Sequence, residues 1–442
     1  MVDPKSYFAP QDEAAEPDEL LTLQRRKLAD LLTEVGAANP FYRRKFHGIR
    51  FDPLTDPLDV LPFTTRSELE ADQVAQPPYG TNLTYPIERY TRYCQTSGTG
   101  GAPLRWLDTN ESWRWVTNCW GIIFAAAGVH PGDRLIFPFS FGPFLGFWGA
   151  FDSSVASGFF SIPAGGMSTL ARLMAIIENH VTVIFCTPTY ALRMAEVARD
   201  EGIDIANSSV RAIIVAGEPG GSIPETRRTI ETAWNARVFD HTGMTEIGPM
   251  SFECQEAPGG VHVIESEFIV EVIDPKTGRA VPDGEPGELI VTNLGRRGSP
   301  LIRYRTNDQV RLVRGRCPCG RCFARLEGGI LGRVDEMFIV RGNNVFPTAV
   351  EAVLRRFAEI AEFRLHVLEN GALTQVRLEI EPVPNVDDLP ALCQRVAHTL
   401  QAALSFRAEV LAVPSGSLPR FEMKARRFIR SNELPRRHGD SK

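Results

Sequence analysis

Helical segments and short apolar runs alternate through the middle of the chain, and this alternation restricts the fold more than any other feature. Each expected helix has apolar residues at helical spacing, and each expected strand is a short apolar run. The predicted order is helix 168–179, strand 181–186, helix 190–201, strand 212–215, helix 224–234 and strand 237–240. This order predicts an α/β fold with a parallel sheet covered by helices, whose ligands bind at the loops after the strand ends.

The flanking regions predict different kinds of structure. Residues 18–35 have the periodicity of a helix, and residues 267–313 are rich in strands and turns, which suggests an antiparallel, barrel-like subdomain. The end of the chain predicts a small α+β module. Its expected elements are a hairpin at 337–345, a helix at 348–357, strands at 362–368 and 375–381, and a helix at 388–404.

Composition excludes several classes of protein. The 442 residues carry a net charge of −6, which gives no reason to expect nucleic acid or a membrane as a partner. The longest apolar runs, 120–129 and 181–186, are too short to span a membrane, and residues 1–20 lack a signal pattern, so we expect a cytoplasmic protein. Eight cysteines do not indicate a disulfide scaffold in a chain of this length. Four of them stand in apolar surroundings and are predicted to be reduced core thiols: Cys94, Cys119, Cys186 and Cys393.

A glycine-rich loop at residues 93–103 lies between two expected strands, 88–93 and 104–107. Its glycines allow sharp turns and close approach to a ligand, and its N–H groups and hydroxyls can surround a phosphate. The loop lacks the Gly-Lys-Ser/Thr of a Walker A motif, and a tight hairpin turn is the alternative interpretation. The residues that carry the phosphate interpretation are Thr96, Ser97, Gly98, Thr99, Gly100 and Gly101.

Two further loops follow expected strands and combine small or hydroxyl residues with a carboxylate. Residues 216–219 follow strand 212–215, and residues 242–246 follow strand 237–240. Glu246 can hold Mg²⁺ that bridges phosphate oxygens, because Mg²⁺ is bound by few carboxylates together with substrate phosphates. The alternative is an acidic residue at the start of a helix.

Two single residues in the C-terminal half are further candidates for ligand binding or catalysis. Asp308 can accept hydrogen bonds from both hydroxyls of a ribose, and an ion pair with Arg303 or Arg305 is the alternative. Lys424 stands in a basic segment, where an exposed lysine is the alternative to a catalytic one.

Taken together, these segments resemble the adenylate-forming enzymes, which include acyl- and aryl-CoA synthetases, adenylation domains and luciferases. Within that superfamily the chain is most similar to the phenylacetate-CoA ligase group. The resemblance extends over residues 41–430 and depends on the order and spacing of several weak motifs. They are residues 96–101, 240–246, 304–308, 332–335 and 342–347, and Lys424.

The resemblance implies a two-step reaction in which AMP is transferred from ATP to a carboxylic acid and the acyl group then passes to CoA. The first step gathers negative charge at the α-phosphate, which positive groups must stabilise. The family's catalytic positions match Lys424, Thr245, Glu246 with Mg²⁺, and His241. Its nucleotide-binding positions match the 96–101 loop and Gly217, Glu218, Pro219, Asp240, Thr242, Asp308 and Arg333.

Family members rotate a C-terminal domain between the two steps. Asp335 matches the hinge position, where a short linker absorbs the backbone change. The resemblance therefore implies a core domain at residues 1–332, which binds ATP and acid, and a mobile lid domain at 333–442. The lid carries Lys424, which residues 342–347 replace at the active site after rotation.

The chain departs from the family pattern at three positions. Ala102 stands where the phosphate loop usually has lysine, so contact with pyrophosphate depends more on backbone groups. Met423 stands where glycine commonly precedes the catalytic lysine. His241 replaces the usual aromatic residue and is interpreted as a stacking or carboxylate-orienting group, with a structural histidine as the alternative.

A cluster of cysteines suggests a metal site. Cys317, Cys319 and Cys322 lie close together in a turn with Pro and Gly, as is typical of structural Zn²⁺. The predicted ligands are Cys254, His262, Cys317 and Cys319, with Cys322 as a substitute for one of them, and related ligases include members with a comparable site. We expect the metal to connect the strand-rich subdomain to the sheet domain. Reduced surface thiols are the alternative.

The predicted acid pocket adjoins residues 137–148, which contain five phenylalanines and a tryptophan. Such a segment can form a flat apolar slot, so an aromatic acid is expected, although core packing is the alternative for most of these side chains. The candidate pocket residues are Phe141, Gly142, Ala216, His241 and Gly243.

Three functions are compatible with the sequence. The first is an aryl-acid CoA ligase, and the second is a stand-alone adenylating enzyme that loads a separate carrier protein or another nucleophile. The third is a non-catalytic nucleotide-binding zinc protein, which the missing loop lysine favours and which Glu246, Asp308 and Lys424 oppose. A homodimer is an open alternative for the oligomeric state.

Overall fold

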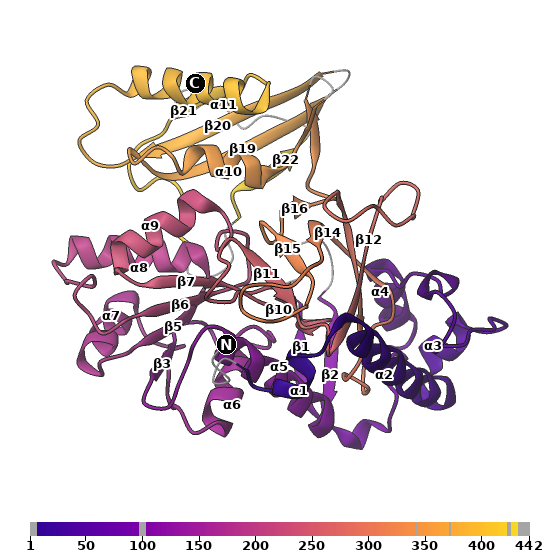
Figure 1. The fold of residues 1–442 in the computed structure, drawn as a ribbon. Helices are drawn as coiled ribbons and strands as arrows, with labels where there is room; N and C mark the ends of the chain where they lie inside the picture. Colours follow the sequence, from indigo (N-terminus) through magenta and orange to yellow (C-terminus); the bar gives the residue numbers. More distant parts are fainter. Residues whose placement is uncertain (1–6, 97–102, 341–342, 371–372, 422–425, 432–442) are drawn as a thin grey trace.

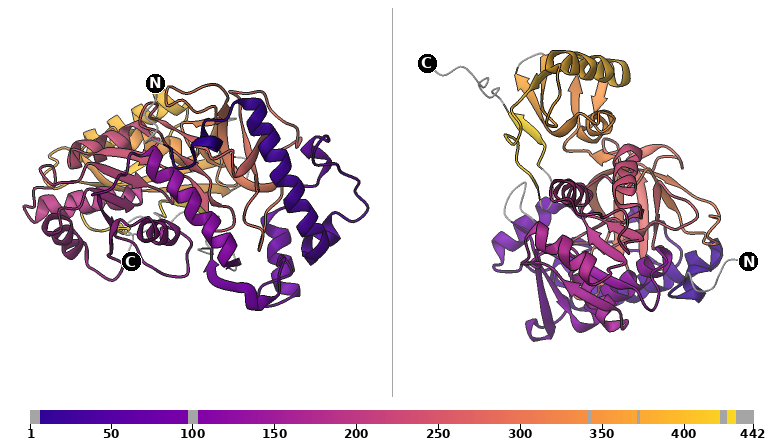
Figure 2. Two further views of the ribbon diagram at one scale, coloured as in Figure 1. Left: turned by 60° about the horizontal axis from the view of Figure 1, so that its bottom comes forward. Right: turned by 90° about the vertical axis from the view of Figure 1, so that its left-hand side faces the viewer.

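The protein is described by a computed structural model covering residues 7–96, 103–340, 343–370, 373–421 and 426–431 (Figure 1). A larger part contains the parallel sheet and the strand-rich region, and a smaller C-terminal module stands beside it (Figure 2). None of the helices in the described residues combines the length and apolarity needed to cross a membrane.

The N-terminal region is helical, as the periodicity of residues 18–35 predicts. The helix α2 begins at a proline and has a capping box formed by Glu16 and Glu19, which explains why it starts one residue before the predicted bound. The helices of this region are α1 (Pro10–Glu13), α2 (Pro17–Ala38), α3 (Pro40–Lys45) and α4 (Arg66–Ala75), with 3-10 turns at Leu58–Val60 and Ile87–Arg89.

A five-stranded sheet lies at the centre of the larger part, and every neighbouring pair in it is parallel. Its order is β4-β3-β5-β6-β7, which confirms the predicted βαβ arrangement. The strands are β3 (Arg134–Phe137), β4 (Phe160–Pro163), β5 (Val183–Cys186), β6 (Ala212–Val215) and β7 (Arg237–Asp240). The helices are α5 (Asn110–Ala126), α6 (Trp148–Ala156), α7 (Thr169–Glu178), α8 (Pro188–Asp200) and α9 (Pro224–Trp234).

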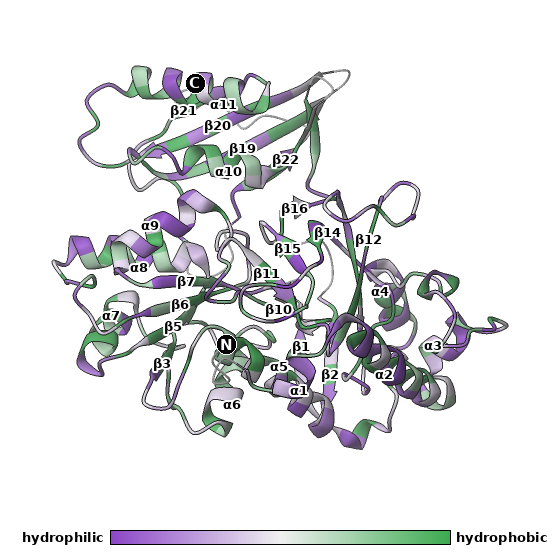
Figure 3. Ribbon diagram, viewed as in Figure 1, coloured by the Kyte–Doolittle hydropathy of each residue, from purple (hydrophilic) through white to green (hydrophobic). Residues whose placement is uncertain are grey.

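Helices cover both faces of this sheet. The helices α7, α8 and α9 pack on one face, where Trp234 is fully buried and donates a hydrogen bond to the Ala191 carbonyl oxygen at 3.1 Å. The helices α5 and α6 pack on the other face. Because the central strands are buried on both sides, they read as continuous apolar runs in the sequence. The outer helices carry hydrophilic as well as hydrophobic residues (Figure 3).

The strand-rich region forms an antiparallel sheet, as predicted. Its order is β10-β11-β15-β14-β13-β12, with β16 paired to β14, and within the described residues this path does not close into a barrel. Two small sheets, β1-β2 and β8-β9, lie beside it. The early strands are β1 (Tyr90–Gln95), β2 (Arg105–Thr109), β8 (Gly243–Met244), β9 (Gly248–Pro249) and β10 (Ser251–Phe252). The later strands are β11 (Gly260–Val263), β12 (Phe268–Ile273), β13 (Pro286–Asn293), β14 (Tyr304–Val313), β15 (Arg325–Glu327) and β16 (Gly332–Arg333).

The C-terminal module is an α+β unit, as predicted, with α10 and α11 packed on one face of a four-stranded sheet. The sheet order is β21-β20-β19-β22, and both outer strands run parallel to their neighbours. The sequence did not predict β21 or β22, which are short edge strands. The elements are β17 (Phe338–Val340), β18 (Asn343–Val345), α10 (Pro347–Leu354), β19 (Ile360–Asn370), β20 (Leu373–Pro382), α11 (Leu389–Leu404), β21 (Glu409–Ala412) and β22 (Phe428–Ser431). The domain boundary after residue 332 stays a prediction.

Candidate active site at the ends of β6 and β7

The loops after β6 and β7 lie side by side because the two strands are neighbours that end at the same level. Val215 pairs with Asp240, and the backbone N–H of His241 donates to the Val215 carbonyl oxygen at 3.0 Å. In the first loop, Gly217 has a φ of 93°, a conformation that favours glycine. The Glu218 carboxylate accepts the backbone N–H of Thr189 at 2.9 Å, which ties this loop to the start of α8.

Asp240, at the end of β7, is held by its neighbours. Its carboxylate accepts the Ser222 hydroxyl at 2.5 Å and the backbone N–H of His241 at 3.0 Å. Burial raises the pKa of Asp240 to about 6, and the Ser222 hydrogen bond opposes this rise. Thr242, two residues later, is fixed through its N–H and its hydroxyl, both 2.8 Å from Ser251 Oγ. The structure thus gives both predicted nucleotide-binding residues defined positions.

His241 is a neutral imidazole. Its Nδ1 lies 2.7 Å from the Ser251 carbonyl oxygen, so Nδ1 carries the proton and Nε2 is left as an acceptor. Burial lowers the pKa of His241 to about 4, against the effect of this hydrogen bond. A neutral ring can stack on or orient a ligand, but it does not pair with a carboxylate as a cation.

Glu246 is buried and contacts two residues from distant parts of the chain. Its Oε1 lies 3.3 Å from Arg66 Nη1 and 3.4 Å from the hydroxyl of Tyr304. The same Arg66 guanidinium lies 3.4 Å from Thr96 Oγ1, so it joins the start of the glycine-rich loop to the carboxylate. Sequence reasoning missed Arg66. The signal available was the capping box of Thr65 and Glu68, which marks the start of α4 and places Arg66 in its first turn.

A second arginine, Arg296, supports the backbone of the predicted catalytic pair. Its Nη1 donates to the carbonyl oxygens of Thr245 at 2.6 Å and Glu246 at 3.0 Å. Its Nε and Nη2 bind both oxygens of Asp108 in β2 at 2.7 and 2.5 Å, and neither side chain of this ion pair is exposed. Sequence reasoning missed this pair, since the two residues lie 188 positions apart.

Asp308 pairs with Arg333, the residue predicted to hold the ribose with it. The two are register partners in β14 and β16, and Arg333 Nη1 lies 3.5 Å from Asp308 Oδ1. The same guanidinium binds Asp335, the predicted hinge residue, at 2.8 and 2.9 Å. The alternative ion pairs for Asp308 were wrong, because Arg303 pairs with Glu271 and Arg305 pairs with Glu288.

The predicted pocket residues Phe141 and His241 are connected by a chain of aromatic rings. The Phe141 ring centroid lies 4.4 Å from that of Phe139, which lies 5.2 Å from that of Phe147. The Phe147 ring is 6.1 Å from the Trp120 ring, which is 4.6 Å from the His241 ring.

Three further pocket candidates are placed by contacts of their backbones. The Gly142 carbonyl oxygen accepts the Trp148 indole N–H at 3.1 Å. The Ala216 N–H donates to the Cys186 carbonyl oxygen at 3.2 Å. A side chain at Gly243 would place its Cβ 2.7 Å from a backbone oxygen, so only glycine fits there.

Six predicted site residues cannot be placed. The phosphate-loop residues after Thr96 and the predicted catalytic lysine lie outside the described residues: Ser97, Gly98, Thr99, Gly100, Gly101 and Lys424. The segment that leads into the loop is described, and Thr96 Oγ1 accepts the Leu104 N–H at 3.0 Å.

Four of the five predicted zinc ligands come together. The ligand atoms of Cys254, His262, Cys317 and Cys319 lie within 4.8 Å of one another, and all four residues are buried. The His262 Nδ1 lies 3.0 Å from the Phe323 carbonyl oxygen, so its Nε2 faces the sulfurs, 3.7 Å from Cys319 Sγ.

Cys322 does not belong to this group. It is half-buried, and its Sγ lies 3.9 Å from a Glu16 carboxylate oxygen, so the structure does not place it as a substitute ligand. The four clustered residues all come from the strand-rich region. The strand-rich region is linked to the parallel sheet at Glu253, the residue before Cys254. The Glu253 N–H donates to the Asp240 carbonyl oxygen at 3.1 Å.

The fold and site define a class of protein: a helix-covered parallel sheet with polar loops at its strand ends, and a separate α+β module. Residues 72–295 match the family model of the AMP-binding enzymes, and residues 342–431 match the C-terminal domain of AMP-binding enzymes. The phenylacetate-coenzyme A ligase of Thermus thermophilus is 32% identical over 439 residues, with 94% of this chain and 97% of that protein covered. That of Escherichia coli is 31% identical, with 94% and 96% covered. The chain therefore belongs to the AMP-binding enzyme family.

Solved structures of one ligase also indicate which domain arrangement this structure has. The 2-hydroxyisobutyryl-CoA ligase in the postadenylation state, in complex with R3-HIB-AMP, matches with a TM-score of 0.91 at 28% identity, covering 96% of this chain and 92% of that one. The same ligase with CoA in the thioesterification state has a TM-score of 0.73, at the same coverage. Because both solved structures are of the same ligase, we attribute the difference between the two TM-scores to the different domain arrangements of that ligase. The arrangement of the present structure is therefore more similar to that ligase in its postadenylation state than in its thioesterification state.

We expect Arg296→Met to lower the free energy of unfolding by about 3–5 kcal/mol, because it leaves the Asp108 carboxylate buried without its partner. The control is Arg297→Met, at the next position, whose side chain is 40% exposed and pairs loosely with Asp30 and Glu34. Arg297→Met is expected to lower the free energy of unfolding by about 1 kcal/mol or less. Urea unfolding of both variants measures this, and equal losses would contradict the role given to Arg296.

Proposed function

We propose that this protein is an ATP-dependent ligase that activates an aromatic carboxylic acid as its acyl-adenylate and transfers the acyl group to CoA. The observation that carries the proposal is its similarity, over almost its full length, to phenylacetate-coenzyme A ligases. The domain arrangement supports it, since the similar solved ligase holds an acyl-adenylate in the same arrangement.

In the first step, a carboxylate oxygen of the acid attacks the α-phosphorus of ATP, and the bond to pyrophosphate breaks. The 96–101 loop holds the outer phosphates, the 216–219 loop contacts the adenine, and Asp308 with Arg333 binds the ribose. Lys424 stabilises the charge that gathers at the α-phosphate. In the second step, the CoA sulfur attacks the acyl carbon, the thiol proton is lost, and AMP leaves.

Mg²⁺ fits the oxygen donors around Glu246. Its carboxylate is buried beside the hydroxyl of Tyr304 and shares Arg66 with Thr96, and Mg²⁺ is bound by few carboxylates together with phosphate oxygens. The ion supplies charge neutralisation at the phosphates when bound. Arg66, at 3.3 Å, orients the Glu246 carboxylate before nucleotide binds.

Zn²⁺ fits the second cluster. Three sulfurs and one imidazole nitrogen, all buried, match the Cys₃His set of a closed structural zinc site. A hydrogen bond from Cys254 lowers the pKa of the Cys319 thiol, which favours the thiolate that binds metal. The metal is structural, because the adenylation chemistry does not need it.

The aromatic character of the acid is supported by the ring chain between Phe141 and His241. Aromatic rings prefer edge-to-face and offset contacts with one another, so a pocket bounded by such rings favours an aryl group over a flexible aliphatic chain. CoA is favoured as acceptor over a separate carrier protein, because the similar full-length proteins are CoA ligases.

The test of the function is pyrophosphate release from ATP and Mg²⁺ across a panel of acids, with and without CoA. We expect release that depends on an aryl acid such as phenylacetate, little release with 2-hydroxyisobutyrate, and a thioester only when CoA is present. Release without a thioester would instead favour the carrier-protein alternative. An absence of release with every acid would contradict the proposed activity.

We expect Lys424→Ala to lower adenylation by about 10²–10³-fold, as removing one transition-state charge donor does elsewhere. ATP binding is expected to remain, because the adenine, ribose and outer phosphates are held by other residues. Arg426→Ala is the control, since Arg426 is exposed and only two positions away. Pyrophosphate release and ATP titration measure the two effects, and an active Lys424→Ala enzyme would show that the lysine is wrongly assigned.

We expect the purified protein to contain zinc, and Cys317→Ala to lose it together with stability on the order of several kcal/mol. Cys322→Ala is the matched control, because Cys322 lies in the same turn but outside the cluster. Elemental analysis measures the bound zinc, and urea unfolding measures the stability of each variant. Metal-free wild-type protein, or equal zinc loss in both variants, would contradict this ligand set.

A further inference from the structure

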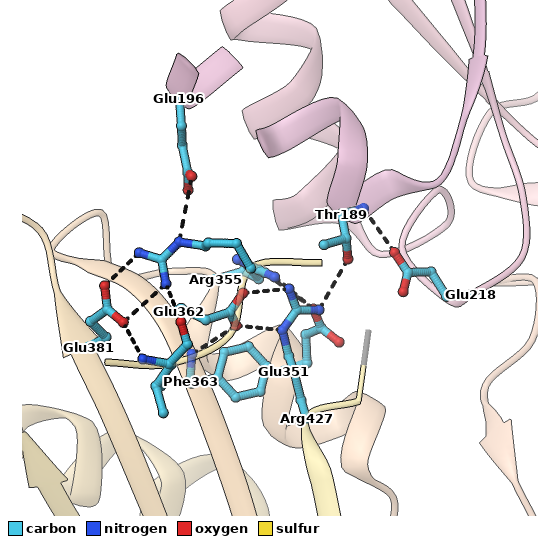
Figure 4. Close-up of polar contacts among 11 residues, drawn as sticks. Thr189, Glu196, Glu218, Glu351, Arg355, Glu362, Phe363, Glu381 and Arg427 are labelled. Atoms are coloured by element: carbon cyan, nitrogen blue, oxygen red, sulfur yellow. Dashed lines mark hydrogen bonds and ion pairs between the residues drawn. The ribbon is translucent and has the colours of Figure 1, made fainter. Parts of the chain in front are cut away.

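Arg427 connects the C-terminal module to the larger part of the protein (Figure 4). Its Nη1 donates to Thr189 Oγ1, in the first turn of α8, at 3.2 Å. The backbone N–H of Thr189 donates in turn to Glu218 in the loop after β6, at 2.9 Å. Two hydrogen bonds therefore link the module directly to the proposed adenine loop.

Arg427 is itself held firmly inside the module. Its Nε and Nη2 bind the two oxygens of Glu362 in β19 at 2.6 and 3.0 Å, and its side chain is 9% exposed. The guanidinium lies 5.1 Å from the ring centroid of Phe363 and 5.8 Å from that of Phe421. A bidentate pair of this kind fixes orientation as well as charge. The group that reaches Thr189 is therefore a rigid extension of the module's sheet.

Arg420, seven positions before Arg427, is held in the same way. Arg420 binds the buried Glu381 in β20 at 2.5 and 3.0 Å, and Glu381 is the register partner of Glu362. Two neighbouring carboxylates would repel each other, and the two arginines offset this repulsion. Arg420 and Arg427, which precede and follow Lys424 in the sequence, are therefore bound to neighbouring positions of the sheet.

We propose that Arg427 is a positioning residue for the adenylation step. It holds the module against Thr189 and the 216–219 loop in the arrangement in which the acyl-adenylate forms. The proposal rests on the proposed function of the same site.

The bond to Thr189 is the specific part of this interface. Two other arginines also reach the larger part, Arg356 at 3.4 Å from Glu225 and Arg420 at 3.9 Å from Glu196. The Arg356 pair is half exposed and the Arg420 contact is long, so solvent weakens both. The Arg427 bond is buried. A single charged hydrogen bond is strong enough to bias the arrangement and weak enough to break when the module moves.

The test removes only the hydroxyl. Thr189→Val keeps the side-chain shape and the N–H bound by Glu218, whereas Thr189→Ser keeps the hydroxyl and is the matched control. The two steps are measured separately, as acid-dependent pyrophosphate release and as thioester formation from supplied acyl-adenylate and CoA. We expect Thr189→Val to lower adenylation about tenfold, since it leaves a buried guanidinium N–H without this partner. Thioester formation from the supplied adenylate should stay unchanged, and Thr189→Ser should behave as the wild type in both steps.

Two outcomes overturn the proposal. Equal loss in both steps would show a merely structural role, and unchanged adenylation would show that the bond does not position the module. Hydrogen exchange of peptides spanning 187–192 and 426–431, without substrate, separates this proposal from the function on which it rests. Faster exchange in Thr189→Val than in Thr189→Ser supports the contact even if the wild type adenylates none of the acids tested. Equal exchange overturns it.

Discussion

The register of the parallel sheet is the constraint on which the site depends. Each residue of β6 pairs with one residue of β7 and the two strands end together, so their loops leave the sheet at the same level. Both faces of the strands are buried, one against α5 and α6 and the other against α7, α8 and α9. A shift by one residue would exchange the side chains of the two faces, which makes this register strongly specified. The proposed adenine loop and the Glu246 loop are therefore brought together by packing far from any ligand.

Arginine side chains then fix the position of Glu246 in the loop after β7. The guanidinium of Arg66 lies beside the Glu246 side chain, and that of Arg296 binds the backbone carbonyls of Thr245 and Glu246. A buried arginine is costly unless it is fully paired, and Arg296 is paired with Asp108 and with both carbonyls. Glu246 is thus held at its side chain by Arg66 and at its backbone by Arg296, and for the proposed metal site this is the preorganisation that electrostatic catalysis requires.

Much of this could be predicted from the sequence, because the relevant signals are local. The alternating helices and apolar runs predicted the sheet, and the cysteine spacing with His262 predicted four residues that the structure brings together. The missed residues are those whose partners are distant in the chain. Arg66 and Glu246 lie 180 positions apart, and no local pattern specifies such a pair. The edge strand β22 was missed for a similar reason, because a four-residue strand is defined by its partner β19 and not by its own pattern.

Polar contacts occur at the interface between the C-terminal module and the larger part. An enzyme that forms the adenylate in one arrangement and the thioester in another needs contacts that separate readily. A large apolar interface would favour one arrangement by many kcal/mol, because every buried square ångström adds to its stability. The contacts between the two parts include arginines of the module that face Thr189, Glu196 and Glu225 of the larger part. Charged and hydroxyl groups regain hydrogen bonds to water when they part, so each of these contacts adds little to the net stability of one arrangement. Within the module, Arg420 and Arg427 are held by the buried carboxylates of Glu381 and Glu362, so the proposed rotation would leave these pairs intact and exchange only the interface.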